Sequence, residues 1–206
     1  FRIIMADHPR IAVVVVAGGK GERAGGAHAV PKQYRLLAGQ PVLARTLSGF
    51  LAMDRIERVL PVIGADHASH YASLGLAHPR LLPPVAGGGT RQSSTLAGLD
   101  ALASDPPDIV LIHDGARPFV EPDVIANVIA ALEDADGALP VTLVTDTIKR
   151  SLDGKTVGGT EDRTQLFAAQ TPQGFRFSAI YDAHRRAIEY SDSFTDDAAI
   201  AEWAGL

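Results

Sequence analysis

Cysteine is absent from this chain of 206 residues. Without it, the protein has no disulfide bond, no thiolate metal ligand and no thiol nucleophile. Long hydrophobic runs are also lacking: none approaches the roughly 18–20 residues that a membrane-spanning helix needs, and the first residues do not resemble the apolar core of a signal peptide. We therefore expect a cytoplasmic protein with no membrane segment.

A surplus of basic residues is missing as well. The chain has 19 lysines and arginines against 24 aspartates and glutamates, which gives a formal net charge of −5. Nucleic-acid-binding proteins usually carry the opposite balance, so nucleic acid is not an expected partner. The basic residues are nevertheless concentrated, because Lys20, Arg23, Lys32 and Arg35 lie close together in the sequence with only Glu22 on the acidic side. Such a cluster can bind an anionic substrate.

Short apolar runs alternate with helical patterns along most of the chain. We expect strands at 11–17, 58–63, 81–85, 109–113 and 139–144, and helices at 42–53, 94–102 and 122–132. Strands that alternate with helices predict a doubly wound α/β fold, in which helices cover both faces of a mostly parallel sheet. One such domain can account for residues 1–206.

Two segments depart from this alternation. Residues 146–163 are polar, and Asp153-Gly154 between extended-looking segments is a strong hairpin signal. The hairpin has little apolar surface for its own domain, so we expect an arm that is either loosely held or reaches another subunit. Residues 195–203 have a helical pattern, and the sequence stops at Leu206 without a closing element. We expect the fold to continue beyond that residue.

The first expected strand leads into a glycine-rich segment. Gly18, Gly19 and Gly21 directly follow the β-branched run that ends at Ala17. Glycine lets the backbone approach a ligand closely, so that its N–H groups can line a polyphosphate. Together with the basic cluster, this segment predicts a site for a nucleoside triphosphate.

Two further segments are expected at the same edge of the sheet, because ligands of open α/β sheets bind beyond the carboxyl ends of the strands. Residues 85–94 lead from a strand through three glycines into a helix, where Ser93 and Ser94 offer hydroxyl groups to a base. Asp114 ends another buried strand. There it can hold Mg²⁺, which takes few protein ligands when phosphates supply the rest.

Each motif also has a purely structural explanation. Asp114 can cap a helix or pair with Arg117, His113 can be a core histidine, and Arg91 can be a solvated first-turn residue. The glycine pattern after the first strand also matches a dinucleotide fingerprint. However, residues 40–46 lack the acid that would bind the ribose, and the lysine–serine or lysine–threonine pair of a Walker motif is missing. The dehydrogenase and P-loop hypotheses are weakened accordingly.

Taken together, the motifs resemble one family closely. They occur in order from about residue 11 to 203, as Ala17-Gly18-Gly19-Lys20-Gly21-Glu22-Arg23, Pro31-Lys32-Gln33-Tyr34, Gly88-Gly89-x-Arg91-x-x-Ser94, His113-Asp114-Gly115-Ala116-Arg117-Pro118 and Asp146-Thr147-Ile148-Lys149. The sequence is similar to the 2-C-methyl-D-erythritol 4-phosphate cytidylyltransferases, which use CTP on the non-mevalonate route to isoprenoid precursors. Some members are fused to the cyclodiphosphate synthase of the same pathway, so the resemblance leaves open that this chain is one domain of a bifunctional protein.

The resemblance implies a Rossmann-like nucleotidyltransferase and a set of site residues. The phosphate of methylerythritol phosphate attacks the α-phosphorus of CTP, and pyrophosphate leaves. Arg23 and Lys32 match the catalytic cations that stabilise the developing charge, and Asp114 matches the position that binds Mg²⁺ or another divalent cation. The family positions whose backbone surrounds the triphosphate correspond to Ala17, Gly18, Gly19 and Gly21. Those that contact the cytosine and the ribose correspond to Gly88, Arg91 and Ser94.

The hairpin at 146–163 resembles a family arm that is exchanged between two subunits. Thr147 and Arg163 match arm positions that hold methylerythritol phosphate in the neighbouring site, and Thr171 and Thr195 match positions nearby. The resemblance therefore implies a homodimer.

Three departures accompany the resemblance. Residues 24–31 are slightly longer than the equivalent connection, and Gly89 stands where many members have an acid. The family's Asn-x-Lys-x-Thr-x-Pro segment, whose lysine contacts the sugar phosphate, is not in this chain. Two other hypotheses stay open: a cytidylyltransferase for another polyol phosphate such as ribitol 5-phosphate, and a nucleotide-binding module without catalysis.

Overall fold

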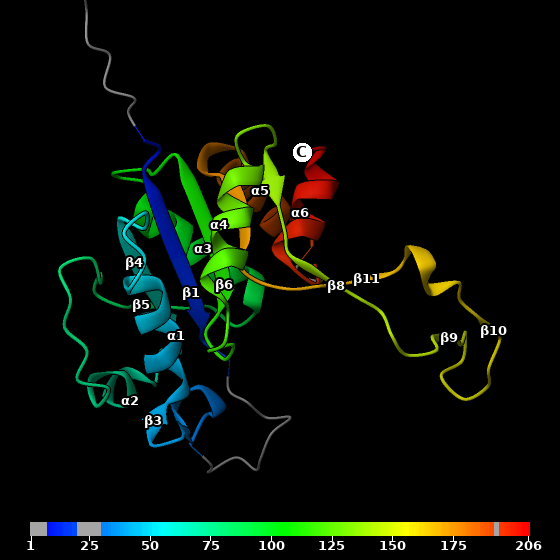
Figure 1. Ribbon diagram of the computed structural model, residues 1–206, viewed down its shortest axis with the longest axis horizontal. Helices are drawn as coiled ribbons and strands as arrows, with labels where there is room; N and C mark the ends of the chain where they lie inside the picture. Colours follow the sequence, from blue (N-terminus) through cyan, green and yellow to red (C-terminus); the bar gives the residue numbers. More distant parts are fainter. Residues whose placement is uncertain (1–7, 20–29, 192–193) are drawn as a thin grey trace, which may run out of the picture.

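A computed structural model of the protein describes residues 8–19, 30–191 and 194–206. Its centre is a six-stranded sheet with the order β5-β4-β1-β6-β12-β7 (Figure 1). The strands are β1 (Ile11–Ala17), β4 (Arg58–Ile63), β5 (Val85–Ala86), β6 (Ile109–Asp114), β7 (Gly137–Ala138) and β12 (Gln173–Arg176). β1 pairs in parallel with β4 and β6, and β4 does so with β5, whereas β12 is antiparallel to both of its neighbours. The expected mostly parallel sheet is confirmed.

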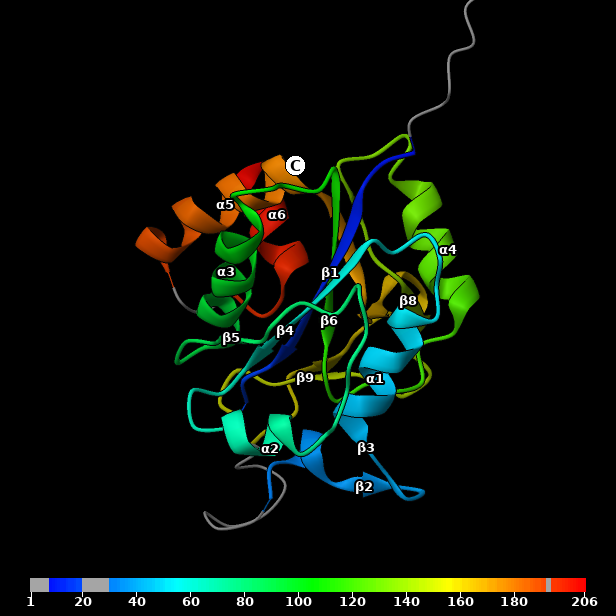
Figure 2. The ribbon, with the colours of Figure 1, turned by 90° about the vertical axis from the view of Figure 1, so that its left-hand side faces the viewer.

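Helices cover both faces of this sheet (Figure 2). Alternate residues of β1 belong to two separate core clusters. Val13 and Val15 pack on the face of the sheet that α1 and α4 cover, whereas Ala12 and Val14 pack on the face that α3 and α5 cover. A strand buried on both faces must be apolar at every position, which explains the continuous run in the sequence. The helices are α1 (Val42–Leu51), α2 (Ala68–Ala72), α3 (Arg91–Leu102), α4 (Pro122–Ala131), α5 (Phe177–Tyr190) and α6 (Asp197–Ala204).

Most of the expected elements are present, and their ends are set by local chemistry. α3 begins three residues before the expected 94–102, because Thr90 caps it: the Thr90 side chain accepts a hydrogen bond from Ser93 N, and the Ser93 side chain accepts one from Thr90 N. The sequence patterns did not predict the amphipathic helix α5. Among the described residues, no helix is both long and apolar enough to cross a membrane.

Two expected strands are wrong in their extent or place. In 81–85, Leu81 makes only an isolated bridge to Val59, and the strand itself is limited to β5. Within 139–144, the strand is β8 (Val141–Leu143), which pairs with β11 (Phe167–Ala169) outside the central sheet. Pro83 and Pro84, which have no N–H groups for a sheet ladder, separate Leu81 from β5. Pro140 directly precedes β8, and its carbonyl accepts a hydrogen bond from Gln170 N at 2.9 Å.

The expected hairpin is present and protrudes from the body (Figure 1). β9 (Lys149–Arg150) pairs antiparallel with β10 (Gly159–Thr160), and the connecting loop contains Gly154 with a φ of +68°. The Asp153 carboxylate accepts hydrogen bonds from Lys155 N and Thr156 N, both at 2.8 Å, which lowers its pKa. The remaining short elements are η2 (Lys32–Tyr34), β2 (Leu36–Leu37), β3 (Gln40–Pro41) and η3 (Arg163–Gln165).

The close contact between α3 and the sheet leads to a prediction about the free energy of unfolding. A Cβ atom at Gly98 would lie 2.6 Å from Val14 Cγ1 and 2.9 Å from Val62 Cγ2. Gly98→Ala should therefore lower the free energy of unfolding by about 1–2 kcal/mol, because overpacking outweighs the gain in helix propensity. Gly49→Ala on α1, where a Cβ atom meets nothing within 4 Å, is the matched control. It should raise that free energy by about 0.5–1 kcal/mol. Urea denaturation measures both, and stabilisation by both substitutions would contradict the packing described.

Candidate functional site

Gly18 and Gly19 directly follow β1 and are called the glycine loop below. They and the loop after β5 lie beside the first turn of α3 at the carboxyl edge of the sheet. Ser94 Oγ donates to the carbonyl of Thr90 at 2.8 Å and lies 3.4 Å from Gly88 O. A Cβ atom at Gly18 would lie 3.2 Å from this hydroxyl, and one at Gly87 only 2.6 Å. Glycine is therefore required for the loops to approach so closely. The structure thus brings together the predicted nucleotide-binding residues Ala17, Gly18, Gly19, Gly88 and Ser94.

Lys32 is connected to the same loop through its neighbour. The side-chain amide of Gln33, which is 2% exposed, donates to Ala17 O at 2.8 Å and to Gly19 O at 3.0 Å. Lys32 itself is exposed on the single turn η2. The predicted residues Gly21 and Arg23 lie outside the described residues.

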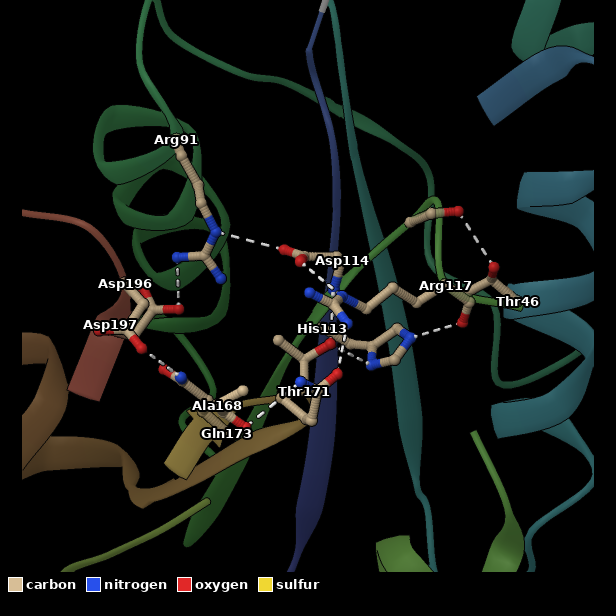
Figure 3. Close-up of polar contacts among 12 residues, drawn as sticks. Thr46, Arg91, His113, Asp114, Arg117, Ala168, Thr171, Gln173, Asp196 and Asp197 are labelled. Carbon is tan, nitrogen blue, oxygen red and sulfur yellow. Dashed lines mark hydrogen bonds and ion pairs between the residues drawn. The ribbon is translucent and has the colours of Figure 1, made fainter. Parts of the chain in front are cut away.

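Two arginines and two aspartates form a network beside these loops (Figure 3). Arg91 extends from α3, with its Nε 3.2 Å from Asp114 Oδ1 and its Nη1 2.7 Å from Asp197 Oδ2. Arg117 Nε lies 3.0 Å from Asp114 Oδ2. Arg91 is therefore not a solvated first-turn residue, whereas the ion pair between Asp114 and Arg117 that the sequence allowed is present.

Asp197 is the buried member of this network. Its side chain is fully buried, and Oδ1 lies 3.2 Å from His184 Nε2. Burial alone would raise the pKa of Asp197, but the neighbouring His184 and the charge of Arg91 outweigh it and hold the pKa below its ordinary value. A carboxylate at this depth requires such a partner, so Arg91 is fixed in place from α6.

His113 supports the other side of Asp114. Burial lowers the pKa of His113 to about 4, so its ring is neutral at pH 7. Nε2 lies 2.9 Å from Arg117 O, a group that can only accept, so Nε2 carries the proton. The Thr171 hydroxyl then donates to Nδ1 at 2.9 Å and accepts from Asp114 N at 3.4 Å. The predicted site residue Thr171 thus also holds the backbone that carries Asp114.

A cleft of about 490 Å³ opens beside this network. Its polar lining includes Arg117, Gln170 and Thr171, and its apolar lining includes Leu37 and Phe119. Arg117 Nη1 donates to Gln170 Oε1 at 2.6 Å, which fixes the guanidinium at the cleft. The cleft can accept part of a ligand whose polar groups approach Thr171.

The two predicted residues of the arm lie apart from this assembly. Thr147 and Arg163 belong to the arm, which extends away from the body (Figure 1), and Arg163 Nη1 donates to Thr145 O within that arm. Thr195 is exposed just before α6. A single protomer thus does not bring Thr147 and Arg163 to the loops that surround Asp114.

Sequence reasoning assigned no role to Gln33 or Asp197. Gln33 was noted only as part of the motif Pro31-Lys32-Gln33-Tyr34, and its burial depends on contacts with a distant strand end. Asp197 follows Asp196, which caps α6 by accepting from Ala199 N, so the second acid gave no separate signal. Its partner Arg91 is 106 positions away in the sequence.

Comparison with known proteins agrees with the fold and the order of the motifs. The chain is 52% identical over 203 residues to "Bifunctional enzyme IspD/IspF" of Rhodopseudomonas palustris (strain BisB18), covering 98% of this chain and 50% of that protein. The same description and 52% identity over 205 residues apply to a protein of Bradyrhizobium diazoefficiens, with the same coverage of 98% and 50%. The chain therefore spans about half the length of these curated relatives.

Solved structures agree as well. A 4-diphosphocytidyl-2C-methyl-D-erythritol synthase from Anaerococcus prevotii superposes with a TM-score of 0.82 at 26% identity, over 96% of this chain and 83% of that one. The bifunctional IspDF of Campylobacter jejuni shares the fold, with a TM-score of 0.75 at 20% identity, over 95% of this chain and 47% of that one.

The family model described as "IspD: 2-C-methyl-D-erythritol 4-phosphate cytidylyltransferase" matches residues 11–206. This range contains every loop of the site described above and the arm. The resemblance first noted from the motifs is confirmed, and the chain belongs to the IspD family of 2-C-methyl-D-erythritol 4-phosphate cytidylyltransferases.

Proposed function

We propose that this chain transfers the cytidylyl group of CTP to 2-C-methyl-D-erythritol 4-phosphate. The products are 4-diphosphocytidyl-2-C-methyl-D-erythritol and pyrophosphate. The observation that carries the proposal is the meeting of the glycine loop, the first turn of α3 and Asp114 at one edge of the sheet. Because the named bifunctional relatives are about twice as long, we also propose that the chain is the cytidylyltransferase half of such a protein.

In the proposed reaction, an oxygen of the acceptor phosphate forms a bond to the α-phosphorus of CTP. The bond from that phosphorus to the bridging oxygen breaks, and the electron pair leaves with pyrophosphate. Negative charge grows on the α-phosphoryl oxygens and the leaving group, so catalysis consists mainly of positioning and charge stabilisation. Lys32, together with Arg23, supplies the positive charge, and the backbone at Gly18 and Gly19 lines the triphosphate.

Base recognition is assigned to the first turn of α3. Ser94 Oγ uses its hydrogen on Thr90 O, so the oxygen is left to accept a hydrogen bond, as from the amino group of cytosine. Close contact between the loops leaves room for backbone rather than side chains at Gly18 and Gly88.

A divalent cation, Mg²⁺, is the proposed cofactor. Asp114 offers a single carboxylate, and the described residues contain no group of three or more potential metal ligands. This fits Mg²⁺ bound mainly by phosphates, since each Asp114 oxygen that pairs with an arginine keeps another lone pair. When bound, the cation would neutralise phosphate charge. We place the reaction in the cytoplasm, in keeping with a chain that contains no cysteine.

A second copy of the chain is the proposed partner, bound through the arm at 146–163. Large apolar side chains are exposed in the arm and the strands beside it: Leu143 (71%), Leu152 (94%), Val157 (68%) and Phe167 (54%). Exposed apolar groups in one segment favour a protein partner. Exchange of arms would bring Thr147 and Arg163 to the site of the neighbouring subunit, where Thr171 and Thr195 also contribute to holding the acceptor.

The first test is turnover by the purified chain. With CTP, methylerythritol phosphate and Mg²⁺, we expect release of pyrophosphate, and chelation of the metal should abolish it. Ribitol 5-phosphate should give a kcat/KM at least ~10²-fold lower, because acceptor hydroxyl groups that find no partners cost transition-state binding. Exclusive use of ribitol 5-phosphate would overturn the assignment of the acceptor, and CTP binding without turnover would indicate a nucleotide-binding module.

Lys32 provides a test of the charge-stabilising role. Lys32→Ala should reduce kcat by at least ~10²-fold, because one preplaced charge is removed. The exposed position of Lys32 predicts unchanged thermal stability. Arg55→Ala is a suitable control, since Arg55 is an exposed cation between α1 and β4, at the opposite edge of the sheet. Equal activity of the two variants would show that the site is misplaced.

Action of the arm in trans can be tested by mixing inactive variants. Lys32→Ala and Arg163→Ala chains should each be nearly inactive alone. A mixed dimer contains one site with both residues intact, so statistical mixing should restore roughly a quarter of wild-type activity. Subunit exchange must be verified by mass spectrometry. Heterodimers without restored activity would exclude action in trans.

A further inference from the structure

The strongest unexplained feature of the site is the Gln33 side chain. Gln33 is 2% exposed, and its amide nitrogen lies within hydrogen-bond distance of two carbonyl oxygens, those of Ala17 and Gly19. A carbonyl can only accept, so both amide hydrogens are used and the orientation of the amide is fixed. One side chain thus holds two backbone carbonyls, at the end of β1 and at Gly19 directly after it.

This contact also sets the direction of the loop's N–H groups. In a trans peptide, the carbonyl of one residue and the N–H of the next point to opposite sides. Because Ala17 O points to the Gln33 amide, the N–H of Gly18 points away from it. The tether therefore presents a backbone donor on the side of the loop that is not occupied by Gln33.

Gln33 also fixes the turn that carries Lys32. On the other flank of this turn Tyr34 is buried, with its ring stacked on His70 at 5.2 Å and edge-on to His67 at 5.4 Å between centroids. The backbone at Lys32 therefore lies next to two consecutive anchors while its side chain remains exposed. The backbone that carries this cation therefore needs less ordering when an anion binds.

We propose that Gln33 is a positioning residue, which holds the glycine loop and Lys32 in one arrangement that receives the triphosphate of CTP. The inference rests on the proposed function and extends it, since Gln33 itself touches no substrate. Loss of the tether would free the loop carbonyls to rotate, so that the backbone donors and the cation would no longer be aligned before CTP binds.

The test is Gln33→Met, which keeps the length of the side chain but removes both hydrogen bonds. CTP affinity is measured by calorimetry, and kcat and KM are measured separately for CTP and for the acceptor. We expect about a 10-fold increase in the Kd and KM for CTP and about a 10-fold decrease in kcat, with the KM for the acceptor changed less than about 2-fold. Gln33→Asn keeps the amide but is one methylene shorter. It should likewise raise the KM for CTP while changing the KM for the acceptor much less.

Arg80→Met is the control. Arg80 is half-buried and donates to Met53 O at 2.7 Å and to Ile56 O at 2.6 Å, in the connection between α1 and β4 at the opposite edge of the sheet. It should lower the melting temperature like Gln33→Met but leave the Kd and KM for CTP within about 2-fold of wild type.

Each result separates the inference from the function on which it rests. If the wild-type chain binds and uses CTP while folded Gln33→Met has the same affinity, the positioning role is excluded and the proposed function stands. Equal losses with Arg80→Met, or failure of both Gln33 variants to fold, would assign Gln33 a structural role only and also overturn the inference. Wild-type protein that does not bind CTP would overturn both.

Discussion

Burial of β1 on both faces is the constraint on which the geometry of the site depends. Because helices cover each side, the residue directly after the strand faces α3: a Cβ atom at Gly18 would lie 3.2 Å from the hydroxyl oxygen of Ser94. The same burial fixes β6 beside β1, with Val16 opposite Asp114. The loop and the carboxylate are therefore placed by the core of the protein, and function is added at an edge whose shape is already set.

The buried carboxylate of Asp197 imposes a second constraint. An ion removed from water must be matched by a partner, and breaking such a pair costs about 3–5 kcal/mol. Arg91 meets this need and reaches Asp114 with the same guanidinium, so α3, α6 and β6 are joined through one side chain. The arrangement explains how a helix near the end of the described chain affects the geometry at the carboxyl end of a central strand.

Local patterns predicted much of the fold, whereas long-range contacts decided what was missed. The apolar runs at 11–17 and 58–63 became β1 and β4 because their burial is visible residue by residue. The strand expected at 81–85 is shortened where Pro83 and Pro84 interrupt the ladder, and the one expected at 139–144 pairs with β11 instead of joining the central sheet. The motifs correctly located the glycine loop and Asp114 at one edge, but the burial of Gln33 and Asp197 depends on partners far away in the sequence, and no local pattern shows it.

The charges of the network determine where the attraction for the proposed substrate, CTP, would come from. Arg91 and Arg117 carry two positive charges, and Asp114 and Asp197 carry two negative ones, so these four residues together contribute none. These residues orient one another and add no net attraction for a polyanion. In a protein with a net charge of −5, the attraction for a triphosphate would then come from Lys32 and Arg23, from backbone N–H groups and from a cation carried by the phosphates. Small displacements of Lys32 relative to the loop should therefore matter more than changes in the number of arginines nearby, because a field built from few charges depends strongly on their distance.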